Sequence, residues 1–571
     1  MNGTLPSTQK RSPIWSAGLL WVIPLLFFIV FFFIPLEAIF KITFDQAAQQ
    51  PFTASNWSRV WRSVQFTFGQ ASLSMLVTLA IGLPGAYLFS RFKFYGKKFL
   101  KAASTVPFIL PTVVVAASFN ALLGPKGLIN FFLMHTFHLE SPPIRILNTL
   151  AAIILAHVFY NTSVVLRMVG SAWEQLDPQL EHAARSLGAS PWQTWWKVTF
   201  PILKTPILAA ALLVFLFDFT SFGVVLLLGG PTYATMEVEI YIQAMHMLNL
   251  PLAGLLSAIQ LGFTLVLTVL YSRLVQKASY ETQPRVLEEE QRKAKSGGEK
   301  LFVGITVIVL FVLLVTPLVA LSVRSFTQLD AERGQRGTLQ TGFTVNYYAS
   351  LFENPRSSIF YVPPIEAVRN SLVYAGITIV VSLVVGLLAA YALSKKVWIN
   401  KLLDPVLMLP LGTSAVTLGL GFILVFNKPP IDVRSFPLLM PIAHSLVALP
   451  FVIRTLLPAI QTIPQSLKQA AAMLGAAPIK VWQHVDFPII GRAAFVAAIF
   501  SFTISLGEFG ATSFLARPEY PTIPVAIYRY LSQPGALNYG QALAMANILM
   551  VVCGVSIYVM ERIQGNALRE V

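Results

Sequence analysis

Twelve apolar stretches of bilayer-spanning length dominate this sequence. A helix needs about 20 mostly apolar residues to cross a membrane. Hydrophobic residues make up 55% of the 571-residue chain and charged residues only 12%, whereas a soluble domain is about 25% charged. The sequence therefore predicts an all-α polytopic membrane protein. The stretches lie near 15–36, 66–90, 102–123, 148–169, 205–229, 252–275, 301–323, 370–394, 402–426, 437–459, 493–516 and 541–560.

The positive charge of the chain indicates its orientation in the membrane. The formal net charge is +16, and the basic residues gather in short loops such as 91–101 and 395–401. Loops of this kind stay on the cytoplasmic side. With the N-terminus inside, 27 of the 41 Lys and Arg residues fall in cytoplasmic segments. We therefore expect a multi-pass protein of the cell membrane with both termini in the cytoplasm, in contact with lipid and not with nucleic acid.

The two halves of the chain are related in sequence. Residues 157–223 match residues 444–510 at a constant offset of 287 without a gap, and such self-similarity indicates a duplicated architecture. We predict a first half of six spans at 1–276, a charged cytoplasmic linker at 277–300 that acts as an extended tether, and a second six-span half at 301–571. An even number of spans gives both halves one orientation, so the substrate path is expected between them.

The best-matched segment is a cytoplasmic loop between the fourth and fifth spans of each half. In the first half, Asp177 before Pro178 is a good N-cap for a short helix, and Gly188 stands where a left-handed residue would end it. Ser190, with Gln193 three residues later, predicts a capping box for a second helix. Two short helices with a sharp turn between them suit docking into the groove of a partner.

These loops resemble a known family motif. Each loop contains two alanines, three residues, a glycine, nine residues, a β-branched aliphatic residue, one residue, an apolar residue and a proline. This pattern is similar to the signature of binding-protein-dependent ABC-transporter permeases. The motif's first residue, usually Glu, is replaced here by His182 and Gln469. The resemblance implies a fused, type I importer permease whose two loops each dock one copy of a cytoplasmic ATPase, and a substrate-binding protein outside. The matching positions are Ala183, Ala184, Gly188, Pro201, Ala470, Ala471, Gly475 and Pro488.

Nothing in the sequence indicates catalysis within the chain. A Walker-type glycine-rich loop with Lys and Ser or Thr is absent from the sequence, so ATP and Mg²⁺ are expected on the partner ATPase and no cofactor on this chain. The lone His135-x-x-His138 pair is too weak a pattern for a metal site. An ion-coupled secondary transporter also has two six-span halves, but would need intramembrane charge pairs rather than duplicated docking loops. A membrane enzyme would need a polar catalytic cluster at one membrane face.

Several segments bear on the substrate. Those at 219–223, 228–231, 234–241 and 505–510 resemble permeases of thiamine type, and ferric-iron permeases share part of the last pattern. Ionisable residues within spans are costly and point to function. We place Asp218 and Glu508 at nearly matching levels in the outer half of the membrane. They predict either an acidic vestibule for a cation, or carboxyl groups that are paired with a neighbouring helix or lie at the outer membrane interface.

Two further pairs of residues occupy equivalent positions of the halves. His157 and His444 lie near mid-span, where they would either line the path or form hydrogen bonds between helices. Pro107 and Pro410 fall at equivalent levels of the third spans, and they predict either a pair of kinked third helices or helix boundaries at these positions.

Overall fold

The computed structural model describes residues 14–49, 51–279, 291–329, 339–353, 362–395, 397–428, 431–432 and 436–567. Within these ranges, eleven helices are long and apolar enough to cross a membrane. A twelfth span is formed if the bent pair at 400–412 and 415–425 counts as one crossing. The predicted all-α architecture of about twelve spans is confirmed.

The first half begins with one long span that contains a short π-helical turn, and it ends with the sixth span. Its elements are α1 (Ile14–Phe28), η1 (Ile29–Phe33), α2 (Ile34–Gln49), α3 (Ala54–Arg91), α4 (Lys97–Ala103), α5 (Val106–Ile109), α6 (Thr112–Leu123), α7 (Leu128–Phe137), α8 (Leu150–Gln175), α9 (Pro178–Ser186), α10 (Pro191–Thr194), η2 (Trp195–Thr199), α11 (Phe200–Phe219), α12 (Gly223–Leu228), η3 (Gly230–Thr232), α13 (Met236–Tyr241), η4 (Ile242–His246) and α14 (Leu250–Ser279).

The second half repeats this order and adds two small antiparallel hairpins, β1 with β2 and β3 with β4. Its elements are α15 (Gly297–Ser325), β1 (Thr327–Leu329), β2 (Leu339–Phe343), α16 (Asn346–Ala349), η6 (Ser350–Phe352), α17 (Pro364–Ser394), α18 (Asn400–Leu407), α19 (Leu409–Gly412), α20 (Ala415–Val425), β3 (Asn427–Lys428), β4 (Ile431–Asp432), α21 (Leu439–Gln461), α22 (Gln465–Met473), α23 (Pro478–Val481), η7 (Trp482–Asp486), α24 (Phe487–Gly507), α25 (Gly510–Leu515), α26 (Ile523–Ser532) and α27 (Ala536–Ala567).

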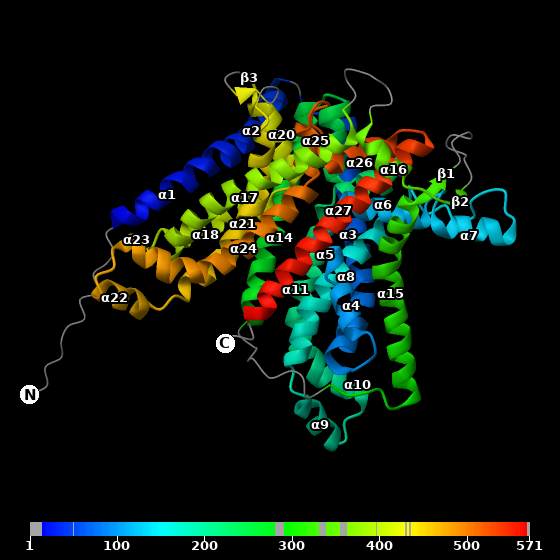
Figure 1. Ribbon diagram of the computed structural model, residues 1–571, viewed down its shortest axis with the longest axis horizontal. Coiled ribbons are helices and arrows are strands. Elements are labelled where there is room, and N and C mark those ends of the chain that lie inside the picture. The colour runs from blue at the N-terminus through cyan, green and yellow to red at the C-terminus, as the bar shows by residue number, and fades with distance from the viewer. Residues whose placement is uncertain are drawn as a thin grey trace, which may run out of the picture.

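The first helix of each half packs against the other half. Helix α1 lies along α17, and α15 lies against α6 (Figure 1). The largest buried apolar cluster accordingly joins residues of α3, α6 and α8 to residues of α15, α20 and α27. This exchange holds the halves together through apolar side chains that each half could not bury alone.

The molecule has two arms that diverge toward one end (Figure 1). The short helices α9 and α22 lie at the tips of different arms, and both tips are at this end. Helix α7 and the strands β1, β2 and β3 lie at the opposite end. The two matched loops of the sequence therefore share one face of the protein.

The fifth spans differ from the prediction of single helices at 205–229 and 493–516. They begin earlier, because α10 and α23 continue through π-helical turns into α11 and α24, and they end at Phe219 and Gly507. A break of two or three residues follows before the short helices α12 and α25. In the second half the break is stabilised by Glu508, whose carboxyl oxygens accept the backbone N–H groups of Ala511 and Thr512 at 2.8 and 2.9 Å.

The end of the linker also differs from the extended, solvated tether that we predicted. Helix α14 runs to Ser279 and α15 begins at Gly297, and residues 280–290 lie outside the described ranges. Arg292 forms a parallel bridge with Phe92, through Arg292 N to Arg91 O at 3.1 Å and Lys93 N to Arg292 O at 2.9 Å. The linker is anchored here because the loop after α3 leaves backbone groups that it can pair.

Candidate functional site between the two halves

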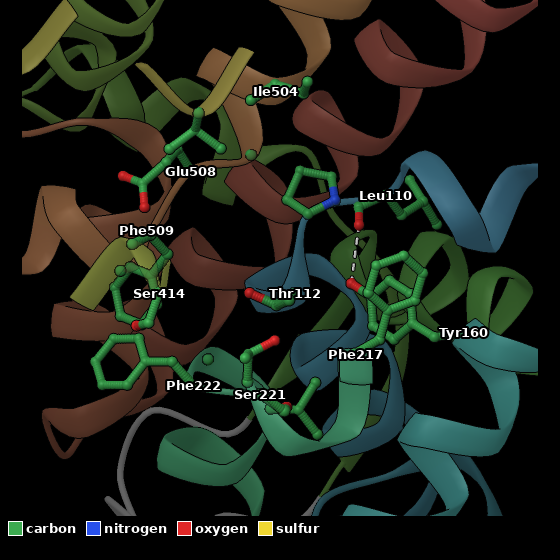
Figure 2. Close-up of a pocket in the computed structure, with 18 of the residues that line it drawn as sticks. Leu110, Thr112, Tyr160, Phe217, Ser221, Phe222, Ser414, Ile504, Glu508 and Phe509 are labelled. Carbon is green, nitrogen blue, oxygen red and sulfur yellow. Dashed lines mark hydrogen bonds between the residues drawn. The ribbon is translucent and has the colours of Figure 1, made fainter. Parts of the chain in front are cut away.

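A cavity of about 440 Å³ lies between the halves and is lined by both of them. Its wall comes from the breaks in the third spans, the ends of α11 and α24, and residues of α8 and α21. Figure 2 shows Tyr160 and Phe217 of the first half facing Glu508 and Ser414 across this space. A defined cavity with a mainly apolar wall thus lies between the halves, where the substrate path was predicted.

The third spans are broken where they meet the cavity. In the first half α5 ends at Ile109, and the extended residues Leu110 and Pro111 precede α6. In the second half the axis turns by 96° between α19 and α20. There Ser414 is the N-cap, and its hydroxyl accepts the N–H groups of Val416 and Thr417. The predicted kinks are present, and they expose polar backbone and hydroxyl groups to the cavity.

The polar cluster of the first half is built around His157. Its Nε2 lies 2.8 Å from Ser221 Oγ, and its Nδ1 lies 3.3 Å from Asp218 Oδ1. Asn161 Nδ2 donates to the same Asp218 oxygen at 2.7 Å. His157, Asp218 and Ser221 all line the cavity. The carboxyl group of Asp218 is therefore paired with a neighbouring helix, as one interpretation of the sequence predicted, and it also lines the cavity. Its role in binding a cation stays a prediction.

The second half has a related cluster, in which the carboxyl residue and the serine have changed places. At the offset of 287, Asp218 corresponds to Ser505 and Ser221 corresponds to Glu508. His444 Nδ1 lies 2.8 Å from Ser505 Oγ, and its Nε2 lies 3.4 Å from Glu508 Oε2. Glu508 is among the residues that line the cavity, and His444 is not. Each half thus supplies one histidine and one carboxyl group. The carboxyl group lies at Nδ1 of the imidazole ring in the first half and at Nε2 in the second half.

A third carboxyl group in the cavity wall was not singled out from the sequence. Glu237 of α13 is buried, and it accepts hydrogen bonds from Gln260 of α14 and from Ser414 of the second half. Residue 524, its equivalent at the offset of 287, is a proline. The sequence did contain a signal for Glu237, because it is an acidic residue inside an apolar segment. It was missed because α13 was not expected as a separate helix.

The two matched loops have nearly identical backbones. Gly188 and Gly475 have φ of +87° and +79°, and each follows a nine-residue helix. The predicted Asp177 cap and the capping box of Ser190 with Gln193 are both present. Leu187 and Leu474 are each 89% exposed. These turns therefore present unburied apolar side chains at the tips of the arms.

Each loop is tied to the helix that leads into the membrane. In the first half Glu181 accepts a hydrogen bond from Thr199 at 2.9 Å and lies 3.5 Å from Arg91 of α3. At the equivalent positions of the second half, Lys468 and Asp486 form an ion pair at 2.9 Å. The two halves thus use different side chains for the same contact, which joins each loop to the residue just before α11 or α24.

The structure separates the predicted site residues into two groups. His157, Asp218 and Glu508 line the cavity, and His444 contacts Glu508. Ala183, Ala184 and Gly188 lie at one arm tip, and their equivalents in the second half lie at the other. The prolines that close the motif begin the membrane helices α11 and α24.

Comparison with known proteins identifies the family. The model of the binding-protein-dependent transport system inner membrane component matches residues 81–280 and again residues 382–570. The chain belongs to this family. This permease therefore carries two copies of the family domain in one polypeptide, as the internal repeat predicted.

Several curated relatives of this permease span most of its length. A thiamine transport system permease protein of Brucella abortus is 25% identical over 86% of each chain. The protein of the same description from Haemophilus influenzae is 24% identical over 96% of each chain. A ferric transport system permease protein of Actinobacillus pleuropneumoniae is 25% identical over 86% of this chain and 69% of its own. Among solved structures, a bacterial ABC transporter that imports alginate matches with a TM-score of 0.37 and 18% identity, covering 47% of this chain and 96% of that one.

Proposed function

We propose that this permease forms the membrane channel of an ATP-driven importer and that two ATPase subunits dock on its arm tips. The observation that carries this proposal is the pair of equivalent turns at Gly188 and Gly475, which share one face and flank a central cavity. ATPase subunits that bind both turns would move the two arms relative to each other. ATP and Mg²⁺ would be bound by the ATPases and not by this chain.

Transport would proceed by alternating access. The face with α9 and α22 is the cytoplasmic face in this proposal, in agreement with the distribution of Lys and Arg, and both termini are cytoplasmic. A substrate-binding protein would deliver cargo to the opposite face, which carries α7 and the strands β1 and β2. In this arrangement the arms diverge on the cytoplasmic side, so the conformation corresponds to one that releases cargo inward.

The cargo in this proposal is a thiamine-type cation. Carboxyl groups and aromatic rings line the same cavity, and a cation is attracted both by a carboxylate and by the face of an aromatic ring. Relatives of this permease are described as thiamine permeases. A ferric permease is also among the relatives, so uptake of ferric iron instead of thiamine is the competing outcome of a transport assay.

Site-specific cross-linking tests the docking proposal. Cysteines are introduced at Leu187 and Leu474, both exposed, in a chain whose one native cysteine, Cys553, is buried. We expect both positions to cross-link to the ATPase encoded with this permease. A matched cysteine at the exposed Phe343 of the opposite face should not do so. Labelling of either turn from outside intact cells, or failure of both to reach an ATPase, would overturn the proposal.

A further inference from the structure

Three carboxyl groups line the cavity, but their hydrogen bonding differs sharply. Glu508 is fully engaged: Oε1 accepts from Ala511 N at 2.8 Å, and Oε2 accepts from the backbone N–H and the hydroxyl of Thr512 at 2.9 and 2.6 Å. It therefore stabilises the first turn of α25. A carboxyl group used in this way has little capacity left for a ligand.

Glu237 is likewise engaged at both oxygens. One accepts from Gln260 and the other from Ser414. These two contacts join α13 to α14 within the first half and to α20 of the second half. Glu237 therefore holds elements of the wall in place.

Asp218 is the exception. Its Oδ1 accepts from Asn161 and lies near His157, while its backbone oxygen accepts from Gln70 at 2.7 Å. Its Oδ2 has no hydrogen-bond partner among the described residues, although the residue is only 1% exposed and lines the cavity. A buried polar atom without a partner is costly. Asp218 is thus positioned by its neighbours with one oxygen left to bind something else.

The surroundings of Asp218 indicate what that ligand is. The cavity wall also contains Phe108, Tyr160 and Phe217 from the first half, and Phe451 and Phe500 from the second. Aromatic faces favour a flat or aromatic body and add attraction for a positive charge. The equivalent position in the second half is Ser505, which bonds to His444 and Thr378. Among the described residues that line the cavity, a carboxyl oxygen without a hydrogen-bond partner is therefore found on one side only.

We propose that Asp218 Oδ2 binds the positive charge of the cargo, that the cargo is an organic cation with an aromatic body, and that Glu508 and Glu237 are positioning residues. This inference rests on the proposed function. It predicts that the permease selects for charge through one residue of the first half, so that cargo binds in a single orientation.

The test measures equilibrium binding to the permease–ATPase complex in nanodiscs, without nucleotide and without binding protein. The probes are radiolabelled thiamine and an uncharged analogue in which thiophene replaces the thiazolium ring. We expect Asp218→Asn to weaken thiamine binding by about ten- to a hundredfold, the range for loss of a hydrogen bond to a charged group. Binding of the uncharged analogue should change little. Asp218→Glu should restore part of the preference for the cation.

Two matched variants separate binding from folding. Ser505→Ala alters the equivalent position of the other half, and it should bind thiamine as the wild type does. Glu508→Gln should lower the midpoint of thermal unfolding while keeping the ratio of thiamine to analogue binding. If Asp218→Asn does not fold, Asp218→Ser copies the residue that the second half already accommodates.

The outcomes distinguish this inference from the proposed function. ATP-dependent thiamine uptake by the wild type, together with an unchanged cation preference in Asp218→Asn, would overturn the role of Asp218 alone. Failure of the wild type to bind thiamine, with uptake of ferric iron in its place, would overturn both the cargo proposal and this inference. Loss of cation preference in Asp218→Asn but not in Glu508→Gln supports it.

Discussion

Phe222 and Phe509 occupy equivalent positions of the two halves and stack on each other, with ring centroids 5.3 Å apart and planes inclined by 29°. Each precedes the glycine that begins α12 or α25, and both line the cavity (Figure 2). The contact therefore joins equivalent points of the two halves. Motion of one half relative to the other would alter it.

Removal of this stack should make it easier for the two halves to separate at the cavity. An aromatic pair is worth about 0.5–1.5 kcal/mol beyond its buried area, which corresponds to a population shift of about two- to tenfold. We expect Phe222→Ala and Phe509→Ala to raise the ATPase rate measured without binding protein by that factor. Phe343→Ala removes a stack with Phe326 within one half and should leave this rate unchanged. A rate unaltered in both cavity variants would contradict the assignment.

Bulky residues at the arm tips should uncouple ATP hydrolysis from transport. A Cβ at Gly188 or Gly475 would meet no atom within 4 Å, so the cost of substitution comes from the positive φ alone. For a β-branched residue this strain is about 1–3 kcal/mol. We expect Gly188→Val and Gly475→Val to reduce uptake while ATP hydrolysis continues. The matched variants Gly188→Asn and Gly475→Asn should transport nearly normally, because Asn tolerates left-handed backbone. Equal uptake by the Val and Asn variants would count against strain as the cause.

The hydrogen bond from Ser414 to Glu237 should stabilise the contact between the halves. Loss of one partner leaves a buried polar group unsatisfied, which costs about 1–3 kcal/mol. A double-mutant cycle with Glu237→Gln and Ser414→Ala should therefore give a coupling free energy of about 0.5–3 kcal/mol, measured by unfolding in mixed micelles. Thr417→Val is the control, because the Thr417 hydroxyl on the same helix has no hydrogen-bond partner among the described residues. Additive effects of the two variants would show that the bond contributes nothing.

Lys97 should react with amine-selective reagents at an unusually low pH. Its ammonium group donates to Phe89 O at 2.6 Å, Phe92 O at 2.9 Å and the linker residue Gln291 at 2.7 Å. Burial lowers the pKa of Lys97 from 10.5 to about 8, so half of the amine is neutral near pH 8. Labelling at this position, followed by mass spectrometry, should have its midpoint at that pH and should disappear in Lys97→Arg. Labelling of Lys97 only above about pH 10, as for an ordinary lysine, would refute the effect of burial.

Much of the fold could be predicted because the features that specify it are local in sequence. The length of the apolar stretches predicted the spans, and the constant offset of 287 residues predicted the duplication. Capping residues such as Asp177, Ser190 and Gln193 predicted the short helices of the first loop. Gly188 was identifiable because few other residues favour a left-handed C-cap.

The cavity could be predicted only in outline. An apolar run does not reveal where a helix stops and turns back, so the breaks after Phe219 and Gly507 were missed. The role of Glu237 depends on Ser414, which is 177 residues away, and the availability of Asp218 depends on which of its oxygens find partners. Such properties arise from tertiary contacts and cannot be read from spacing.

Reconstitution measures the central claim most directly. The purified permease is placed in proteoliposomes with its ATPase and binding protein, and uptake of labelled thiamine is followed with and without ATP. The account predicts uptake that requires ATP and all three components, and that is lost in Gly188→Val. Uptake by the permease alone, driven by an ion gradient and indifferent to the ATPase, would contradict it.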